Sequence, residues 1–356
     1  MDFLYCPSGG VMRILFGANP VPFLRVGGLL TQILNTKKYL EKMGVAVELF
    51  NGWEPFDSKK FDLFHLFWAN LSTHFLGATM KEQGLKMVLS PVFFSRHSPR
   101  VLSGIHTFGK VLSRVKSIQL GHLYTSELCQ LSDMNLPNSK REALLLQKGL
   151  GVPENKIRII PNGVEERFYS ADPSLFKKRY GIENFILYVG HIGSGRKNTL
   201  RLLKVLKEID HPAVLIGPVV KGSYSDLCLE EACKSKNILI LPSLENDSPL
   251  LESAYAACEV FVLPSLFETP GIAALEAGLA GAKVVITPYG GTEEYFEDLA
   301  EYVDPKSERS INNGIVRALN KKRDDRLKEH IHKNFLWERV AKETVKVYEE
   351  LVSQRG

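Results

Sequence analysis

Residues 260–276 decide the fold: the run Val260-Phe-Val-Leu263 leads through Pro-Ser-Leu-Phe into Glu268-Thr-Pro-Gly-Ile-Ala-Ala-Leu-Glu276. The first four residues are wholly apolar, which is typical of a central parallel strand covered on both faces. Pro264 ends this strand, and Pro270 is placed to open a helix because proline is favoured in the first helical turn. The stretch therefore predicts a strand, a loop and a helix of an α/β protein with parallel sheets.

The junction between strand and helix has the properties of an anion site. The first N–H groups of a helix have no partner within it and the helix dipole favours negative charge there, so the amides of Gly271 and Ile272 predict a phosphate site. Glu268 and Glu276 would repel a phosphate, so we expect them to bind something else. An ionised carboxylate accepts two hydrogen bonds from vicinal sugar hydroxyls. A pair of solvated surface carboxylates is the alternative interpretation.

Length and composition indicate a two-domain enzyme. The chain has 356 residues, 44% hydrophobic and 24% charged, which is ordinary for a globular protein of about two domains. Its five cysteines are scattered and include no C-x-x-C pair, so neither a disulfide framework nor a zinc site is expected. No stretch approaches the ~20 apolar residues of a membrane span. We expect a cytoplasmic protein.

The first half of the chain is basic. Residues 1–150 hold 17 Lys and Arg against 10 Asp and Glu, and the interval between Glu82 and Glu127 has no acidic residue. This interval contains His97, and its basic residues alternate with apolar ones at near-helical spacing: Lys86, Arg96, Arg100, Lys110, Arg114 and Lys116. The pattern suits an anionic acceptor or a membrane surface, with a peripheral position on the inner face of the membrane. A helix with a core face and a solvated basic face is the alternative. Nucleic acid is not expected, because no recognised binding motif accompanies the patch.

Strands and helices alternate along the whole chain, in two series. In the first we predict strands at 12–16, 45–50, 63–67, 87–89 and 157–160, and helices at 29–42, 100–116 and 139–149. After a turn-rich segment at 165–184, the second has strands at 185–189, 213–216, 238–241, 260–263 and 284–286, and helices at 200–209, 223–235 and 249–258. One helix is predicted from about 324 to 352.

The loop after the strand at 185–189 reads His191-Ile-Gly-Ser-Gly-Arg196-Lys-Asn198 and leads into a helix. Cations at a helix start are disfavoured by the dipole, so we expect a compensating anion. A diphosphate between this loop and Gly271 fits, with Arg196 as a forked donor and Lys197 as a point charge. The alternative is a solvated basic turn. The glycines match neither a dinucleotide fingerprint nor a P-loop, and the sequence supports no metal site.

These motifs together resemble the retaining glycosyltransferases of the GT-B fold, in particular glycosyltransferase family 4. The resemblance covers nearly the whole chain. Its most specific parts are the E-x7-E segment 268–276, the loop 190–198, the phrase Ile160-Pro-Asn-Gly-Val164 and the phrase Gly290-Gly-Thr-Glu-Glu294. It implies two Rossmann-like, doubly wound parallel-sheet domains that face a central cleft. The expected domains are an acceptor-binding domain at 1–164, joined by a C-terminal helix at about 337–356 that crosses back to it, and a nucleotide-sugar-binding domain at 165–336.

The resemblance also implies roles for single residues. Glu276 would bind ribose hydroxyls, and residues 241–244 would lie beside the base. Arg196 and Lys197 would bind the diphosphate, the amides of Gly271 and Ile272 the phosphate or sugar, and Glu268 a hydroxyl of the transferred sugar. Gly27 and Gly28 match the glycine loop of the first domain, where a plain helix-entry turn is the alternative. Family members place a histidine after a middle strand; here Val92 stands near that place, and His97 is the candidate. His65 is expected to be a core residue.

The implied activity is metal-independent transfer of a hexose, with retention of configuration, from a nucleotide sugar to a glycan or lipid-linked glycan. No cofactor is expected beyond the GDP- or UDP-linked donor, and the Arg196-Lys-Asn198 phrase favours GDP-mannose. Two alternatives stay open. One is a GT-B-like nucleotide-sugar epimerase, and the other is a nucleotide-sugar-binding protein without catalysis.

Overall fold

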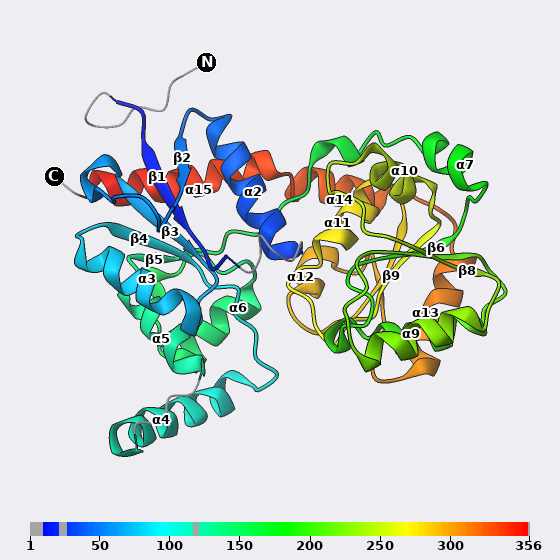
Figure 1. The fold of residues 1–356 in the computed structure, drawn as a ribbon, viewed down its shortest axis with the longest axis horizontal. Coiled ribbons are helices and arrows are strands. Elements are labelled where there is room, and N and C mark those ends of the chain that lie inside the picture. The colour runs from blue at the N-terminus through cyan, green and yellow to red at the C-terminus, as the bar shows by residue number, and fades with distance from the viewer. Residues whose placement is uncertain (1–9, 21–26, 117–120, 355–356) are drawn as a thin grey trace. The chain divides into compact units, whose positions relative to one another are not determined.

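The computed structural model describes residues 10–20, 27–116 and 121–354 (Figure 1). The chain divides into two units. One contains Met1–Asn162 together with Trp337–Gly356, and the other is Gly163–Leu336. Each unit contains one sheet whose strands all pair in parallel. The predicted α/β class with two doubly wound parallel sheets is confirmed.

The first unit has a five-stranded sheet in the order β2-β1-β3-β4-β5. Its elements are β1 (Arg13–Gly17), α2 (Gly28–Glu41), β2 (Ala46–Leu49), β3 (Leu63–Phe67), α3 (Leu71–Glu82), β4 (Lys86–Ser90), α4 (Pro99–Lys116), α5 (Gly121–Leu131), β5 (Met134–Asn135), α6 (Lys140–Leu144) and α15 (Trp337–Ser353). Helices α2 and α15 lie side by side (Figure 1). The apolar face of α15 contributes Trp337, Val340 and Val345 to one of the two apolar clusters of this unit.

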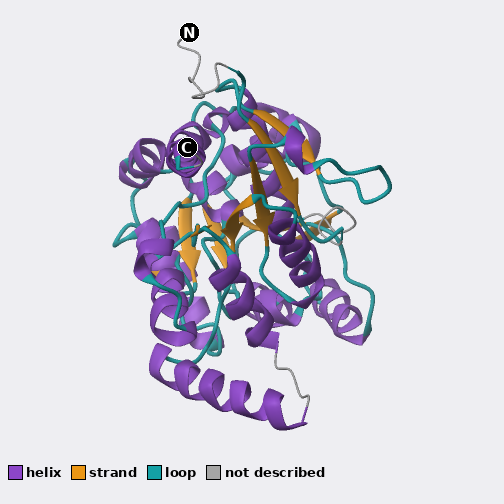
Figure 2. Ribbon diagram, turned by 90° about the vertical axis from the view of Figure 1, so that its left-hand side faces the viewer, coloured by secondary structure: helices purple, strands orange, loops and turns teal. Residues whose placement is uncertain are grey.

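The second unit has a six-stranded sheet in the order β11-β10-β9-β6-β7-β8. Its elements are α7 (Ser174–Tyr180), β6 (Ile186–Val189), α8 (Thr199–Lys207), β7 (Ala213–Ile216), α9 (Ser223–Cys233), β8 (Ile238–Leu241), α10 (Pro249–Ala257), β9 (Val260–Leu263), α11 (Ile272–Leu279), β10 (Lys283–Ile286), α12 (Thr292–Phe296), β11 (Glu301–Tyr302), α13 (Glu308–Asn320) and α14 (Arg326–Asn334). Figure 2 colours the elements of both units by type, and its orange strands are flanked by purple helices.

The order of strands in the second unit creates a switch point. The chain begins in the middle of the sheet with β6 and adds β7 and β8 on one side. It then returns to place β9 against the other side of β6, followed by β10 and β11. In open parallel sheets, ligands bind outside the carboxyl ends of the strands at the point where the order reverses. In this unit that point lies between the loops that follow β6 and β9.

Three predicted elements differ from the structure. Residues 157–160 form no strand, because only Ile157 bridges to Asn135, at the end of the two-residue strand β5. The segment 165–184, predicted as turns, contains α7. The single terminal helix is two helices, α14 and α15, because residue 335 leaves the helical path: its carbonyl accepts the N–H of Val164 at 2.8 Å.

Candidate functional site

The loops after β6 and β9 meet at the switch point of the second sheet. The loop after β6 ends in a 3-10 turn, Gly195–Lys197, just before α8. The loop after β9 carries Glu268, and the N–H of Leu266 in the same loop donates to the carbonyl of Arg196 at 2.8 Å. The sequence predicted an anion site between these two loops, and the structure brings their charged side chains together.

Glu268 is the centre of the charged group. The Lys197 ammonium lies 2.6 Å from Glu268 Oε1, and the Arg196 guanidinium lies 3.2 Å from the same oxygen. Arg196 also donates to the Phe267 carbonyl at 3.1 Å and lies over the Phe267 ring, 5.3 Å from its centroid. The side chains of Glu268 and Lys197 are 7% and 15% exposed, whereas that of Arg196 is 41% exposed. Arg196 is therefore the cation of this group that remains most open to solvent.

The two cations keep Glu268 ionised. Burial alone would raise the pKa of this carboxyl, but Lys197 and Arg196 outweigh that effect and lower the pKa to about 2. Burial lowers the pKa of Lys197, against the opposing effect of Glu268. The ionised carboxylate therefore compensates one of the two positive charges, that of Lys197 or of Arg196, while no ligand is bound. An ammonium group has three donors, and Glu268 occupies one of them.

Hydrogen bonds to backbone carbonyls and a backbone bridge hold both loops in place. The side-chain amide of Asn198, which adopts a left-handed φ of 59°, donates to the carbonyls of Pro264 at 3.0 Å and Pro305 at 2.6 Å. Glu268 forms a parallel bridge with Gly290, where a Cβ would lie 1.8 Å from the Glu268 carbonyl oxygen. Only glycine fits this approach, because Gly290 also has a φ of +111°. The phrase Gly290-Gly291 thus serves to hold Glu268.

The helix after Glu268 begins later than the sequence predicted. Pro270 lies outside α11, which starts at Ile272, and Gly271 precedes it with a left-handed φ of 88° that no α-helical residue adopts. The Thr269–Pro270 peptide is cis. Ile272 opens the helix, so its N–H has no carbonyl one turn earlier to bond with. Gly271 lies beside Glu268, because a Cβ on Gly271 would be 3.7 Å from the Glu268 Cβ.

Glu276 has a different environment from Glu268. It lies in the second turn of α11. The Tyr255 hydroxyl donates to its Oε2 at 2.7 Å, and the Asn246 amide donates to its Oε1 at 3.0 Å. Among the described residues, no Lys, Arg or His forms an ion pair with it. Burial raises the pKa of Glu276 to about 7, and the two hydrogen bonds only partly oppose this.

Sequence reasoning missed Tyr255, Asn246 and Arg167. Asn246 follows β8, beside the segment 241–244 that was assigned to the nucleotide base. Tyr255 is a single polar residue in the otherwise apolar end of α10. No sequence motif contains both Tyr255 and Glu276. Arg167 donates to the Asn246 carbonyl and pairs with Glu252 at 3.0 Å. The one feature of the sequence that could have pointed to Arg167 is its position shortly after the motif at residues 160–164.

The remaining predicted site residues belong to the first unit. Gly27 precedes α2 in a fully extended conformation, φ −176° and ψ 178°, so its backbone angles do not require glycine, and Gly28 is the first residue of that helix. His97 is exposed and precedes α4. Val92, at the place where the resemblance leads us to expect a histidine, has a φ of 52°, which is strained for a β-branched residue.

His65 is a core residue, as predicted. It is buried on β3, and its ring nitrogens contact the Tyr348 hydroxyl at 2.5 Å and the Ser90 hydroxyl at 2.9 Å. Burial lowers its pKa to about 3, so the ring is neutral. Across the described residues, no three His, Cys, Asp or Glu side chains are grouped as a metal ion would require.

Part of the basic stretch forms α4, whose exposed residues include apolar as well as basic side chains. Leu102 and His106 are buried, whereas Val101, Phe108 and Val111 are 50%, 67% and 55% exposed. The side chains of Arg114, Val115 and Lys116 lie outside the described ones. In the part of the chain that the structure describes, no helix is long and apolar enough to cross a bilayer.

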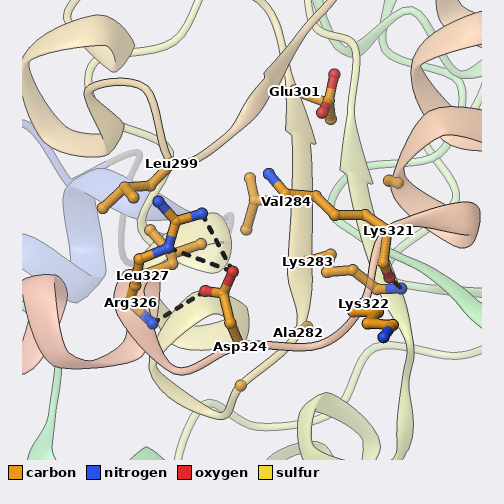
Figure 3. Close-up of a pocket in the computed structure, with 12 residues that line it drawn as sticks. Ala282, Lys283, Val284, Leu299, Glu301, Lys321, Lys322, Asp324, Arg326 and Leu327 are labelled. Carbon is orange, nitrogen blue, oxygen red and sulfur yellow. Dashed lines mark hydrogen bonds and ion pairs between the residues drawn. The ribbon is translucent and has the colours of Figure 1, made fainter.

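A hollow of about 30 Å³ lies elsewhere in the second unit, near the amino end of β10 (Figure 3). Basic and acidic side chains line it, and Asp324 pairs with Arg326 at 3.1 Å. Lys283 is engaged with Glu259 at 3.0 Å and with the carbonyl of residue 321 at 2.8 Å. The hollow is too small for a nucleotide and lies at the end of the strand opposite the switch point, so it is not the candidate site.

Comparisons with known proteins find similar sequences among glycosyltransferases. Residues 175–334 match the family described as Glycosyl transferases group 1. An uncharacterized glycosyltransferase of Methanocaldococcus jannaschii is 28% identical over 83% of this chain and 77% of its own length. The sulfoquinovosyl transferase of Arabidopsis thaliana is 24% identical over 78% of this chain, which spans 60% of that relative.

Solved structures show the same fold. Sucrose-phosphate synthase from Thermosynechococcus elongatus aligns with a TM-score of 0.75 at 17% identity, over 96% of this chain and 100% of that one. HepE of Anabaena, in complex with UDP and glucose, aligns with a TM-score of 0.68 at 18% identity, over 95% and 100%. At these identities the likeness concerns the fold, which is that of GT-B glycosyltransferases. Residues 175–334 therefore resemble the Glycosyl transferases group 1 family, and the chain has the fold of GT-B glycosyltransferases.

Proposed function

We propose that this glycosyltransferase moves a hexose from a GDP- or UDP-linked donor to a glycan or lipid-linked glycan, with retention of configuration and without a metal ion. The observation that carries the proposal is the meeting of Lys197 and Arg196 with Glu268 at the switch point of the second sheet. Two cations and a nearby helix start offer a site for a diphosphate, and the carboxylates offer acceptors for hydroxyls.

The proposed mechanism follows from where charge develops. When the bond between the anomeric carbon and the phosphate oxygen breaks, negative charge gathers on the departing diphosphate. Cations fixed in advance stabilise this charge more in the transition state than in the bound donor, and so lower the barrier. Lys197 keeps two donors beyond the one that contacts Glu268, and Arg196 is the more open of the two cations. We assign both to the diphosphate.

The other residues are assigned to binding and orientation. Both cations contact Oε1 of Glu268, so Oε2 is the oxygen proposed to accept a hydroxyl of the transferred sugar. The amides of Gly271 and Ile272 would donate to the phosphate or sugar, and Glu276 would accept from the ribose. The acceptor hydroxyl attacks the anomeric carbon on the face that the diphosphate leaves, and its proton passes to a phosphate oxygen. Neither a metal nor a separate base is needed for this step.

The first unit is proposed to bind the acceptor. Gly27 and Gly28 at the start of α2 would approach the diphosphate and acceptor, and His97 is the proposed side-chain contact to the transferred sugar. His97 is exposed, so its ring is available to a ligand. Replacing His97 with Ala should lower kcat more than nucleotide affinity if the ring touches the reacting sugar.

The outer face of α4 is proposed to bind an anionic membrane surface that presents a lipid-linked acceptor. Exposed Phe108 and Val111 would enter the interface between headgroups and acyl chains, while Arg100 and Lys110, both exposed, would meet lipid phosphates. Helix α4 contains no Asp or Glu that would oppose this. This implies a cytoplasmic protein at the inner face of the membrane.

Nucleotide binding is the first test. Isothermal titration of GDP, UDP and ADP should reveal one tight ligand, and Lys197→Ala and Glu276→Ala should each weaken it or lower kcat/KM for transfer by at least about 2 kcal/mol. Product analysis across an acceptor panel then separates the possible activities. A changed donor sugar without acceptor would indicate an epimerase, and binding without turnover would indicate a non-catalytic protein.

Vesicle binding tests the α4 surface. At low salt, sedimentation with vesicles of phosphatidylglycerol and phosphatidylcholine should exceed that with phosphatidylcholine alone, and Phe108→Ser should reduce it. Leu131→Ser, which alters another exposed apolar residue, on α5, is the matched control. Equal binding to both vesicle types would remove the membrane from the proposal but leave the donor site untouched.

A further inference from the structure

Glu276 is held by neutral donors on both of its oxygens. Tyr255 donates to Oε2 at 2.7 Å and Asn246 donates to Oε1 at 3.0 Å. A carboxylate oxygen can accept two hydrogen bonds, so each oxygen of Glu276 keeps one further acceptor site. A ligand with two adjacent hydroxyls can use both sites at once. The terminal torsion of a glutamate is broad, and donors on both oxygens restrict it.

Tyr255 is itself fixed in the core. Its side chain is fully buried on α10, and its ring meets that of Phe168 edge-on at 5.6 Å between centroids. Burial raises the pKa of the Tyr255 phenol well above its ordinary value, so the hydroxyl keeps its proton and acts as a donor to Glu276. The donor is therefore in place before any ligand binds.

Asn246 is fixed through its backbone. Arg167 donates to the Asn246 carbonyl, and the same guanidinium pairs with Glu165 at 3.1 Å and Glu252 at 3.0 Å. Arg167 also lies over the Phe168 ring, 4.1 Å from its centroid. The loop after β8 is thus tied to α10 and to the 3-10 turn at Glu166–Phe168. Asn246 can then present its amide to Glu276 from a defined position.

We propose that Tyr255 and Asn246 are positioning residues that hold the Glu276 carboxylate ready for the two hydroxyls of a ribose. They would thereby set the preference of the enzyme for ribonucleotide over deoxyribonucleotide donors. This inference rests on the proposed nucleotide-sugar site, and it adds to that proposal the source of discrimination at the pentose. A site with organised acceptors rejects a ligand that lacks the matching hydroxyls, because its polar groups are left unpaired.

The test compares two forms of one nucleotide. Affinities are measured by isothermal titration for the tightest-binding of GDP, UDP and ADP and for its 2′,3′-dideoxy form, which has no hydroxyls for Glu276. We expect the wild-type protein to prefer the ribonucleotide by at least about tenfold, from two hydrogen bonds to a charged group. Tyr255→Phe should reduce this preference by at least about fivefold, with the dideoxy affinity within about twofold of wild type. Asn246→Ala should act in the same direction.

A matched control separates positioning from folding. Tyr302→Phe also removes one phenol hydrogen bond in the second unit, from Tyr302 to the Glu297 carbonyl at 2.8 Å, and should leave the preference unchanged. If Tyr255→Phe weakens both nucleotide forms equally, or changes neither, the positioning role is overturned while the donor site stands. If the wild-type protein binds none of the three diphosphates, the donor site itself fails, and this inference fails with it.

Discussion

Replacing Glu276 with Gln should stabilise the second unit at alkaline pH while weakening nucleotide binding. The reason is that burial raises the pKa of Glu276 from 4.5 to about 7. In the folded protein this carboxyl holds its proton more tightly than in the unfolded chain. Its contribution to stability is therefore fully present below pH 4.5 and is lost as the pH rises to about 7. Gln keeps the shape of the side chain and removes the charge.

The magnitude follows from the two pKa values. With 4.5 in the unfolded chain and about 7 in the fold, linkage gives an ionisation cost for the wild type of about 1 kcal/mol at pH 5 and about 3 kcal/mol at pH 8. Any constant cost of the Gln amide beside Tyr255 cancels when the two pH values are compared. The stability of Glu276→Gln relative to wild type should therefore rise by about 2.5 kcal/mol from pH 5 to pH 8.

The assay must report on the second unit. The three tryptophans, Trp53, Trp68 and Trp337, all belong to the first unit, so tryptophan fluorescence would follow the wrong part of the chain. Hydrogen exchange of peptides from β9 and α11, measured by mass spectrometry at several urea concentrations and at both pH values, reports on the unit that contains Glu276. A stability difference that is the same at both pH values, or that falls with pH, would refute the reasoning.

Three further predictions concern the same unit. Lys197→Ala should lower kcat/KM about 30-fold or more, measured by steady-state transfer to whichever acceptor the panel identifies, because it removes a buried cation from the proposed diphosphate site. Gly290→Ala should lower stability by at least about 2 kcal/mol and transfer with it, since its Cβ would lie 1.8 Å from the Glu268 carbonyl oxygen; an unchanged melting temperature would contradict this. Nucleotide binding at pH 7 should release protons, because hydroxyl donors favour ionised Glu276, and titration in buffers of different ionisation enthalpy should show proton release.

Two control variants sharpen the first two of these tests. Lys204→Ala removes a lysine from the exposed side of α8, outside the candidate site, and should leave transfer unchanged. Gly104→Ala adds a Cβ on α4 that meets no atom within 4 Å, and should be neutral or stabilising by up to about 1 kcal/mol. If these controls change transfer or stability as much as the test variants do, the losses do not come from the assigned contacts.

Strands were the most predictable part of the fold. The apolar runs at 213–216 and 260–263 match β7 and β9 at both ends, because strands covered on both faces need an unbroken apolar sequence. The two-residue strand β11 has no such run and was not predicted. The break between α14 and α15 was also missed, because a contact between residues 164 and 335 creates it, and helical periodicity does not record tertiary contacts.

The candidate site was predictable where its charged residues lie in the loops that follow strands. Arg196, Lys197 and Glu268 each follow a central strand, and strand order brings their loops together. Tyr255 could not be found in this way, because it lies on a helix and reaches Glu276 only through packing. The start of α11 was misplaced because the proline rule favours Pro270, whereas Gly271 adopts a backbone angle that no helix contains.

The two glutamates of the E-x7-E segment lie in different structural environments. Gly271 separates the segment into a strand-like part that bridges to Gly290 and a helical part that packs on α10. Glu268 therefore faces cations and stays ionised, with a pKa of about 2, while Glu276 faces neutral donors and has a pKa of about 7. The Glu268 carboxylate stays charged beside Lys197 and Arg196 across the physiological pH range. The Glu276 carboxyl can change its charge near neutral pH, because burial favours its protonated form against two hydrogen bonds and the charge of Arg167.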